Sequence, residues 1–292
     1  MAADPALLRP SPRTRRRKLV NRLMEALATV AALGAVAVLA IVIVSVARRG
    51  ASALDWGFLT KTPAGFGLAG GGIANSIVGT AVLVGLATAM VLPLGVLVAI
   101  YVAEFAPPRI ALVIRLALDV LNGIPSIVIG IFVFALIVAG RGQSGFAGAF
   151  ALAIIMLPLV SRATQEMLRL VPNTLREGAL ALGASRWRTV LGIVLPSSLG
   201  GILTGTTLAI ARAAGETAPL LFTSSIAANA VTADPHQALP SITVTIFNLS
   251  ESADPHDQAR AWAAALVLIG FVLVASLASK ALLARSRRKP TR

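Results

Sequence analysis

Six apolar segments, each long enough to cross a membrane as a helix, constrain the fold of this 292-residue chain more than any other feature. A hydrocarbon layer of about 30 Å needs about 20 helical residues to span it. The segments lie near 21–47, 73–103, 116–139, 145–168, 198–222 and 260–284. Lipid offers the backbone no hydrogen-bond partners, so spans of this length form helices. The sequence therefore predicts an all-α, polytopic membrane protein with six transmembrane helices.

The composition excludes several other classes of protein. With 57% hydrophobic and 13% charged residues, the chain is too apolar for a soluble domain of its length. Its net charge of +14 would suit nucleic acid, but the basic residues flank the apolar segments, and a single Tyr gives no platform for stacking bases. We therefore expect no nucleic-acid partner. The absence of cysteine from the sequence excludes disulfides and thiol catalysis.

The first apolar segment has two readings, a cleaved signal peptide or a retained helix. Arg15-Arg16-Arg17-Lys18 precedes it, and Ser45-Val46-Ala47 resembles a cleavage site. However, its apolar run is about twice as long as a signal-peptide core of about 7–15 residues. We therefore expect a retained transmembrane helix over 19–48.

The distribution of Lys and Arg predicts the orientation. Of the 26 such residues, 20 lie in the two tails, between the second and third spans, or around 162–188. Five lie in the other connections, and Arg212 lies within a span. Because cytoplasmic segments carry the excess of positive charge, we expect a multi-pass protein of the plasma (inner) membrane with both termini cytoplasmic.

These features divide the chain into five parts. They are a basic cytoplasmic tail at 1–18, the first transmembrane helix at 19–48, an outer connection at 49–72, a core of five helices at 73–285 with a cytoplasmic loop at 168–196, and a basic C-terminal tail at 286–292. We expect the first tail to be disordered and to touch anionic membrane lipid.

The two long outer connections carry weaker signals. In the first, we expect Trp56, Phe58 and Phe66 to anchor at the membrane interface. In the second, 242–247 alternates in polarity and fits either a short strand or a re-entrant helix.

Other polar residues predict no further site. His236 and His256 lie 20 residues apart without defined ligand spacing, so we interpret them as solvated turn residues and expect no metal site. Asp119, near the inner end of the third span, is expected to pair with Arg115 or Arg109.

Arg212 and Glu216 are the charges placed deepest in an apolar segment. Counted from Leu199, Arg212 lies about 20 Å along the fifth span. A charged residue there faces a wet cavity or a partner, and Glu216 lies one helical turn further on the same face. Two interpretations stay open. The pair either locks helix packing, or leaves Arg212 available to bind a passing oxyanion through parallel hydrogen bonds.

The predicted cytoplasmic loop carries residues at fixed spacing. Glu177-Gly178-Ala179 is followed after three residues by Gly183 and after nine more by Ile193-Val194-Leu195-Pro196. The spacing predicts two short helices around a glycine turn. It resembles the Glu-Ala-Ala coupling loop of the membrane subunits of ATP-binding-cassette (ABC) importers, from which only Gly178 departs. The alternative is an ordinary amphipathic hairpin between two spans.

A second resemblance points to one branch of that family. Residues 211–221 read Ala-Arg-Ala-Ala-Gly-Glu-Thr-Ala-Pro-Leu-Leu, which resembles the signature of the A-type permease subunits of high-affinity phosphate importers. The sister C-type subunits are similar up to Gly-Glu-Thr but continue Met-Ala-Val, so Ala218-Pro219-Leu220 favours the A type. Segments such as Gly123-Ile124-Pro125-Ser126 extend the resemblance over about 70–285.

The resemblance implies the fold of a type I ABC importer membrane domain and the import of inorganic phosphate. The partners it implies are a sister C-type permease subunit, two copies of a cytoplasmic ABC ATPase and an external phosphate-binding protein. The sequence has no Gly-Lys pair and therefore no P-loop. We expect no cofactor in this chain, which is not itself an enzyme, and expect the partner ATPase subunits to bind ATP and Mg.

The resemblance also implies roles for residues. Arg212, Glu216 and Thr217 would line the substrate path. The residues expected to couple to the ATPase are Glu177, Gly178, Ala179, Gly183, Ala184, Arg186, Trp187, Arg188, Leu195 and Pro196. Among these, Glu177 and the Arg186-Trp187-Arg188 patch would meet a groove of the ATPase, and Gly183 would allow the turn.

Glu216 leads to a hypothesis on selectivity. A carboxylate repels an anion unless the anion donates a hydrogen bond to the carboxylate. Phosphate near neutral pH carries at least one hydroxyl and sulfate carries none, so Glu216 would favour phosphate and repel sulfate. A site that hydrogen-bonds a substrate hydroxyl rejects an analogue lacking it far better than apolar shape does.

Three other functions compete with phosphate import. The nearest is a permease for another oxyanion, such as sulfate or molybdate. An ion-coupled secondary transporter would show repeated halves, and no clear internal repeat is visible in the sequence. An intramembrane hydrolase would need a Ser–His or paired-Asp arrangement within the spans, yet both histidines lie outside them.

Overall fold

The computed structural model describes residues 12–63, 70–225 and 230–287, which fall into two compact units, Met1–Arg49 and Gly50–Arg292. Helix α1 (Pro12–Gly50) makes up the first unit and contains the first predicted span. Residues 12–18, which we predicted as disordered tail, are therefore helical. Proline suits the start of a helix because its missing N–H would be unpaired there anyway. The predicted tail residues 1–11 and 288–292 lie outside the described residues.

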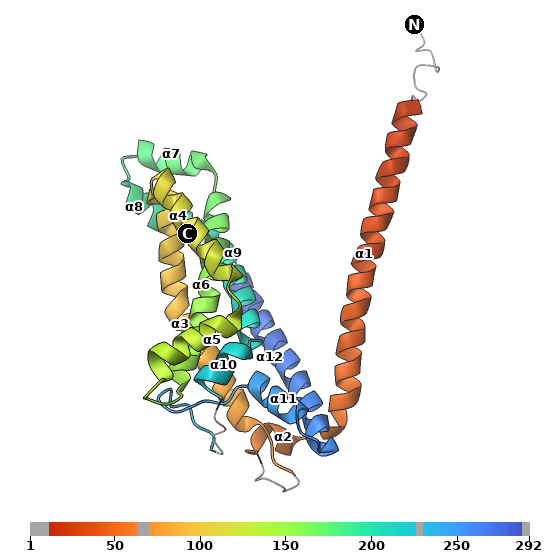
Figure 1. Ribbon diagram of the computed structural model, residues 1–292. Coiled ribbons are helices and arrows are strands. Elements are labelled where there is room, and N and C mark those ends of the chain that lie inside the picture. The colour runs from red at the N-terminus through yellow and green to blue at the C-terminus, as the bar shows by residue number, and fades with distance from the viewer. Residues whose placement is uncertain (1–11, 64–69, 226–229, 288–292) are drawn as a thin grey trace. The chain divides into compact units, whose positions relative to one another are not determined.

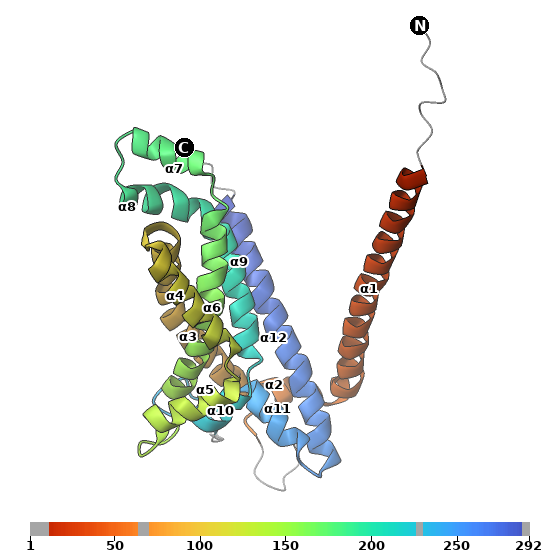
Figure 2. The ribbon, with the colours of Figure 1, turned by 45° about the horizontal axis from the view of Figure 1, so that its top comes forward.

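Four long helices form the body of the second unit and lie side by side in both views (Figures 1 and 2). They are α3 (Ala74–Ile100), which continues as the π-helical turn η3 (Tyr101–Phe105), α6 (Gly145–Arg169), α9 (Leu195–Ala214) and α12 (Pro255–Arg287). Helices α7 (Asn173–Ala181) and α8 (Arg186–Thr189) lie beyond one end, and α2 (Trp56–Thr60), α10 (Ala218–Thr223) and α11 (Ile242–Ser250) gather at the other. The all-α membrane architecture is confirmed.

The third predicted span is not one continuous helix. It consists of α4 (Pro108–Gly123) and α5 (Ser126–Val133), which continues as the π-helical turn η4 (Phe134–Val138), and the two parts meet at an angle of 96°. Pro125 disfavours a helical conformation in the residue before it, and Ile124 is extended. Among the described residues, five helices are long and apolar enough to cross a membrane, or six if this bent pair counts as one span.

The fifth predicted span, 198–222, differs at both ends. It stops at Ala214, because Gly215 is the C-cap of α9, and the separate short helix α10 begins at Ala218. At its other end, α9 continues without a break through the π-helical turn η5 (Val190–Val194) into α8, which gives one helical stretch over Arg186–Ala214. The predicted loop 168–196 therefore ends inside a helix.

Helix α11 decides between the two structures predicted for 242–247, a strand or a re-entrant helix. The segment is helical, and Ser241 Oγ caps it by accepting a hydrogen bond from the Val244 N–H at 3.2 Å. Two further bonds hold α11 to α3. Thr80 Oγ1 accepts from the Ile242 N–H at 2.9 Å, and the hydroxyls of Ser76 and Thr245 lie 2.7 Å apart.

The aromatic residues of the first outer connection do not share one role. Phe58 packs into an apolar cluster with Ile73, Ile242, Ala263 and Ala264 and is 2% exposed, so the predicted interfacial anchor is wrong for this residue. Trp56 is 79% exposed and stays available as an anchor. Phe66 lies outside the described residues.

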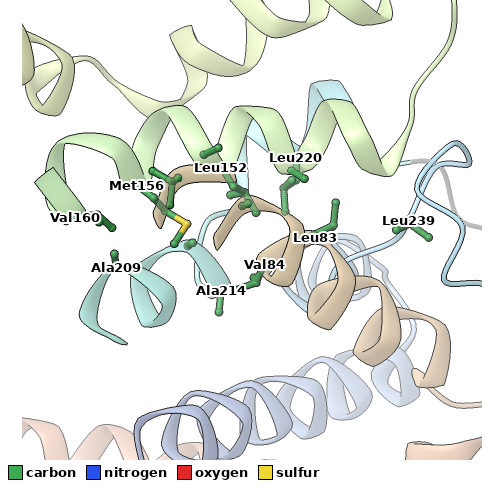
Figure 3. Close-up of a cluster of buried hydrophobic side chains, with 14 of the residues drawn as sticks. Leu83, Val84, Leu152, Met156, Val160, Ala209, Ala214, Leu220 and Leu239 are labelled. Atoms are coloured by element: carbon green, nitrogen blue, oxygen red, sulfur yellow. The ribbon is translucent and has the colours of Figure 1, made fainter. Parts of the chain in front are cut away.

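A buried cluster joins α3, α6, α9 and α10 (Figure 3). Its labelled members are Leu83, Val84, Leu152, Met156, Val160, Ala209, Ala214, Leu220 and Leu239. Small residues bring the helices close together: a Cβ added at Gly205 of α9 would clash with Ala163 of α6. Such close packing stabilises helix contacts in lipid, where apolar surroundings provide no hydrophobic drive.

Gly79 of α3 provides a test of this packing. A Cβ at this position would clash with the backbone carbonyl of Pro240, whereas one at Gly85 of the same helix would meet nothing within 4 Å. We expect Gly79→Ala to lower the free energy of unfolding by about 1–3 kcal/mol, because a rigid backbone cannot move aside. Gly85→Ala should leave it unchanged or raise it through better helix propensity. Thermal unfolding of both variants in detergent measures the difference, and equal destabilisation would contradict this packing.

Candidate functional site

A tight turn joins α7 to α8 at one end of the four long helices. Gly183 has a φ of +83°, the left-handed conformation that glycine adopts at low cost. The Gly183 N–H donates to the Leu180 carbonyl at 2.9 Å and the Ala184 N–H to that of Ala179 at 3.0 Å. This bond pattern is a Schellman motif, which pairs the last carbonyls of a helix. The predicted glycine turn, hereafter the α7–α8 turn (173–189), is confirmed. Helix α7 is short as predicted, whereas α8 is the start of the continuous helical stretch Arg186–Ala214.

The outer surface of the α7–α8 turn is partly apolar. Leu182 is 91% exposed, Trp187 53% and Leu175 46%. Of the residues predicted to couple to an ATPase, the structure brings Glu177, Gly178, Gly183, Ala184, Arg186, Trp187 and Arg188 together on this turn. Ala179 is buried, while Leu195 and Pro196 lie further along, at the start of α9.

Arg176 is the polar centre beneath this surface. Its Nε and Nη2 donate to Glu104 Oε1 at 3.3 and 2.8 Å, and its Nη2 and Nη1 donate to the carbonyls of Leu168 at 2.7 Å and Val171 at 2.5 Å. The Arg176 and Glu104 side chains are only 18% and 10% exposed. The planar guanidinium with its five donors suits this task, which a lysine cannot perform. Arg176 thus joins α7 to the ends of α3 and α6.

Phe105 makes the second contact between α3 and the turn. Its ring stacks on Trp187 of α8 with 4.4 Å between centroids, and the Arg186 guanidinium lies 5.5 Å from the Phe105 centroid. Stacked rings and a cation over a ring face are both favourable arrangements. The sequence did not indicate the roles of Glu104 or Phe105, since their partners lie more than 70 positions away.

Arg212 lies near the opposite end of α9, about 39 Å from Arg186 along the continuous helix. Its Nε is 3.7 Å from Glu216 Oε1, which is too long for a hydrogen bond. The Arg212 side chain is 51% exposed and that of Glu216 16%. Among the described residues, the guanidinium therefore makes an ion pair and no hydrogen bond.

The interruption of the helix between α9 and α10, and α10 itself, are held by side chains from other segments. Thr243 Oγ1 of α11 donates to the Glu216 carbonyl at 2.9 Å. Gln143 Nε2 donates to the Leu221 and Phe222 carbonyls, each at 3.3 Å, and its Oε1 accepts from the Ser225 N–H at 2.8 Å. Thr217, the third residue of the predicted substrate path, follows Glu216 and is the N-cap of α10. The three predicted path residues therefore lie together around one break.

Packing corrects the expectation about one other charged residue. Asp119 of α4 pairs with Arg162 of α6, so the predicted pairing with Arg115 or Arg109 is wrong. Asp119 therefore pairs with an arginine of the helix that packs against α4, and not with an arginine near it in the sequence. Among the described residues, no three His, Asp or Glu side chains gather as candidate metal ligands.

The family follows from similarity to known proteins. Residues 92–288 match the family described as binding-protein-dependent transport system inner membrane component. The chain belongs to this family. The phosphate transport system permease protein PstA of Yersinia pestis is 40% identical over 248 residues, 84% of each chain. PstA of Xylella fastidiosa (strain Temecula1) is 38% identical over 277 residues, 94% of this chain and 96% of its own length. The resemblance predicted from 211–221 is confirmed.

Solved structures of ABC transporters share the fold. An inward-facing form of the MetNI methionine ABC transporter matches with a TM-score of 0.57 and 16% identity, over 73% of this chain and 94% of that chain. A bacterial ABC transporter that imports the acidic polysaccharide alginate gives a TM-score of 0.52 at 17% identity, over 75% and 80%. The ABC importer membrane-domain fold is confirmed. As an inner membrane component of this family, the chain is a multi-pass permease subunit that works in a complex, not an enzyme.

The glycines of the α7–α8 turn allow a matched test. Gly183 needs a positive φ, whereas Gly178 lies inside α7 with open space around it. We expect Gly183→Ala to destabilise the turn by about 1 kcal/mol, the cost of a left-handed alanine, and Gly178→Ala to stabilise α7 by about the same amount. Amide hydrogen exchange of 173–189 should therefore become faster in the first variant and slower in the second. A change in the same direction in both would contradict the assigned conformations.

Proposed function

We propose that this chain is the permease subunit of an ATP-driven ABC importer that moves inorganic phosphate across the plasma (inner) membrane into the cytoplasm. PstA relatives supply the substrate class, and Arg212 is the observation in this chain that carries the proposal. Its guanidinium is half-exposed, lies on a membrane helix, and has donors not used by Glu216. Charge-assisted, bidentate hydrogen bonds from such a group suit a tetrahedral oxyanion. Thr217 adds a neighbouring hydroxyl to the path.

The exposed face of α9 supports a second membrane subunit as a partner. An arginine that faced lipid at this depth would be costly. The same helix also exposes Thr204 and, at 71%, Leu208. A sister C-type permease subunit across this face would enclose Arg212 in a shared, solvated path. Sulfate or molybdate would fit the guanidinium as well, so selectivity for phosphate depends on Glu216.

The α7–α8 turn supports the ATPase as the other partner. Apolar side chains gathered on a surface mark a protein-binding site, and Leu182, Leu175 and Trp187 are such side chains. The charged residues Glu177, Arg186 and Arg188 surround them and favour a partner with a complementary pattern of charge. We assign two ATPase copies, one to this turn and one to the sister subunit. ATP and Mg are bound by the ATPase, so this chain needs no cofactor of its own.

The excess of Lys and Arg supports the proposal that both termini and the α7–α8 turn are cytoplasmic. The end formed by α2, α10 and α11 then faces outward, toward an external phosphate-binding protein. In this mechanism, closure of the ATPase dimer pushes on the α7–α8 turn, and the helices rock so that the path opens outward. Phosphate enters, contacts Arg212, and leaves inward after ATP hydrolysis.

Arg212→Ala tests the proposal. In proteoliposomes that contain the chain with its permease, ATPase and binding-protein partners, we expect uptake of labelled phosphate to fall about 10- to 100-fold, as for the loss of charge-assisted hydrogen bonds. Thr204→Ala is the matched control on the same exposed face, because the Thr204 hydroxyl bonds only to its own helix, at Gly200. Uptake that survives Arg212→Ala at the wild-type rate would exclude Arg212 from the path.

Glu216→Gln tests the hypothesis on selectivity. The amide keeps the shape of the carboxylate but removes the charge that repels a fully ionised anion. We expect the preference for phosphate over sulfate to fall, with sulfate uptake or sulfate-stimulated ATPase activity rising. This reasoning follows the general rule that a site paired with a substrate hydroxyl rejects analogues lacking it. If the variant keeps the full preference for phosphate, Glu216 plays no discriminating role.

A further inference from the structure

We propose that Glu104 and Phe105, consecutive residues at the end of α3, form the joint that passes movement of the α7–α8 turn to α3. The inference rests on the proposed function, because it assumes that a partner ATPase moves this turn. Arg176 and Trp187 are then positioning residues. They hold the turn to the joint rather than touch the transported ion.

The joint holds the two halves of the turn by different chemistry. Glu104 binds α7 through two hydrogen bonds from Arg176, in a pair that is mostly buried. Phe105 binds α8 through the stacked ring of Trp187 and the guanidinium of Arg186. These contacts lie on either side of Gly183 in the chain. The turn therefore cannot tilt as a unit without moving the end of α3 or breaking one of the contacts.

Helix α3 depends on these contacts more than its neighbours do. Helix α6 leads into α7 through 170–172, and α8 continues through η5 into α9, so both follow the turn through the covalent chain. Helix α3 instead continues through Ala106 and Pro107 into α4. An apolar cluster also packs these helix ends together, with Ala99, Ile100, Leu168, Val171, Val190 and Val194 as its buried members. Apolar burial is non-directional, whereas the ion pair and the stack define a position.

The local backbone places both joint residues on the same turn. Tyr101–Phe105 is a π-helical turn, closed by a 2.7 Å hydrogen bond from the Ala106 N–H to the Tyr101 carbonyl. Such turns are rare and often occur at functional positions. A second π-helical turn, Val190–Val194, lies where the chain leaves α8. Helix α3 therefore ends, and α9 begins, at a π-helical turn on the side of the α7–α8 turn.

The far end of α3 reaches the candidate substrate path. Over Ala74–Phe105 the helical stretch has 32 residues, or about 48 Å at the usual rise. At that end, Ser76 and Thr80 bond to α11, and Thr243 of α11 bonds to the carbonyl of Glu216. A continuous set of contacts therefore runs from the α7–α8 turn through α3 to Glu216.

The first test measures phosphate taken up per ATP hydrolysed in the reconstituted complex. We expect Glu104→Gln and Phe105→Leu each to lower this ratio about tenfold, within the usual range of coupling between sites, while ATPase binding and basal hydrolysis persist. Glu104→Gln combined with Arg176→Gln should lose no more than the larger single effect, because the two residues form one contact. Arg169→Gln, an exposed arginine at the end of α6, and Trp56→Leu, an exposed tryptophan of α2, are the controls and should keep the wild-type ratio.

The second test does not depend on the transported ion. The native sequence has no cysteine, so a Leu208→Cys variant carries a single reactive thiol one turn from Arg212. Its labelling rate should change when a non-hydrolysable ATP analogue binds the complex, and Glu104→Gln should suppress that change. A wild-type uptake ratio together with wild-type ATP-dependent labelling in Glu104→Gln would overturn the joint. The joint would also be overturned if Glu104→Gln lowered ATPase binding by the same factor as phosphate uptake. If the unaltered complex takes up no phosphate, the proposed function fails, and the labelling experiment still decides on the joint.

Discussion

Wherever a membrane helix of this chain breaks, backbone carbonyls lose their partners, and lipid cannot replace them. At the end of α6 and around α10, the structure supplies side-chain donors for such carbonyls. Arg176 bonds to the carbonyls of Leu168 and Val171 at the end of α6. After α9, Thr243 bonds to the carbonyl of Glu216, while Gln143 bonds to two carbonyls around the end of α10. Each donor comes from another segment, so satisfying the broken backbone also joins separate helices.

The break after α9 coincides with candidate functional residues, and one physical reason accounts for both. Irregular backbone at membrane depth is tolerated where it is buried in protein or lines a solvated cavity. Arg212 and Glu216 lie on either side of the break at Gly215. This interruption of the helix is therefore also a position where charge is accommodated.

Hydropathy and local turn chemistry predicted much of this arrangement. The spans that became α1, α6 and α12 are continuous apolar runs, and the turn at Gly183 has a local glycine signal. The 96° bend before α5 could not be predicted from the sequence. A proline such as Pro125 is compatible with a mild kink or a full break, and packing decides between them.

The contacts within the site were harder to predict than the helices. Glu104 and Arg176 lie 72 positions apart, and their pairing depends on how α3 meets the end of α6. Arg212 could be identified from the sequence because a cation inside an apolar segment is costly unless it faces a partner or a solvated cavity. In the structure, Arg212 lies on α9, which continues into α8, while the Glu216 carbonyl is held by α11 and, through it, by α3. Under the proposed function, a shift of α3 relative to α9 would change the 3.7 Å separation of the pair. A shorter separation would let the carboxylate hydrogen-bond the guanidinium, and a longer one would leave the guanidinium to an anion.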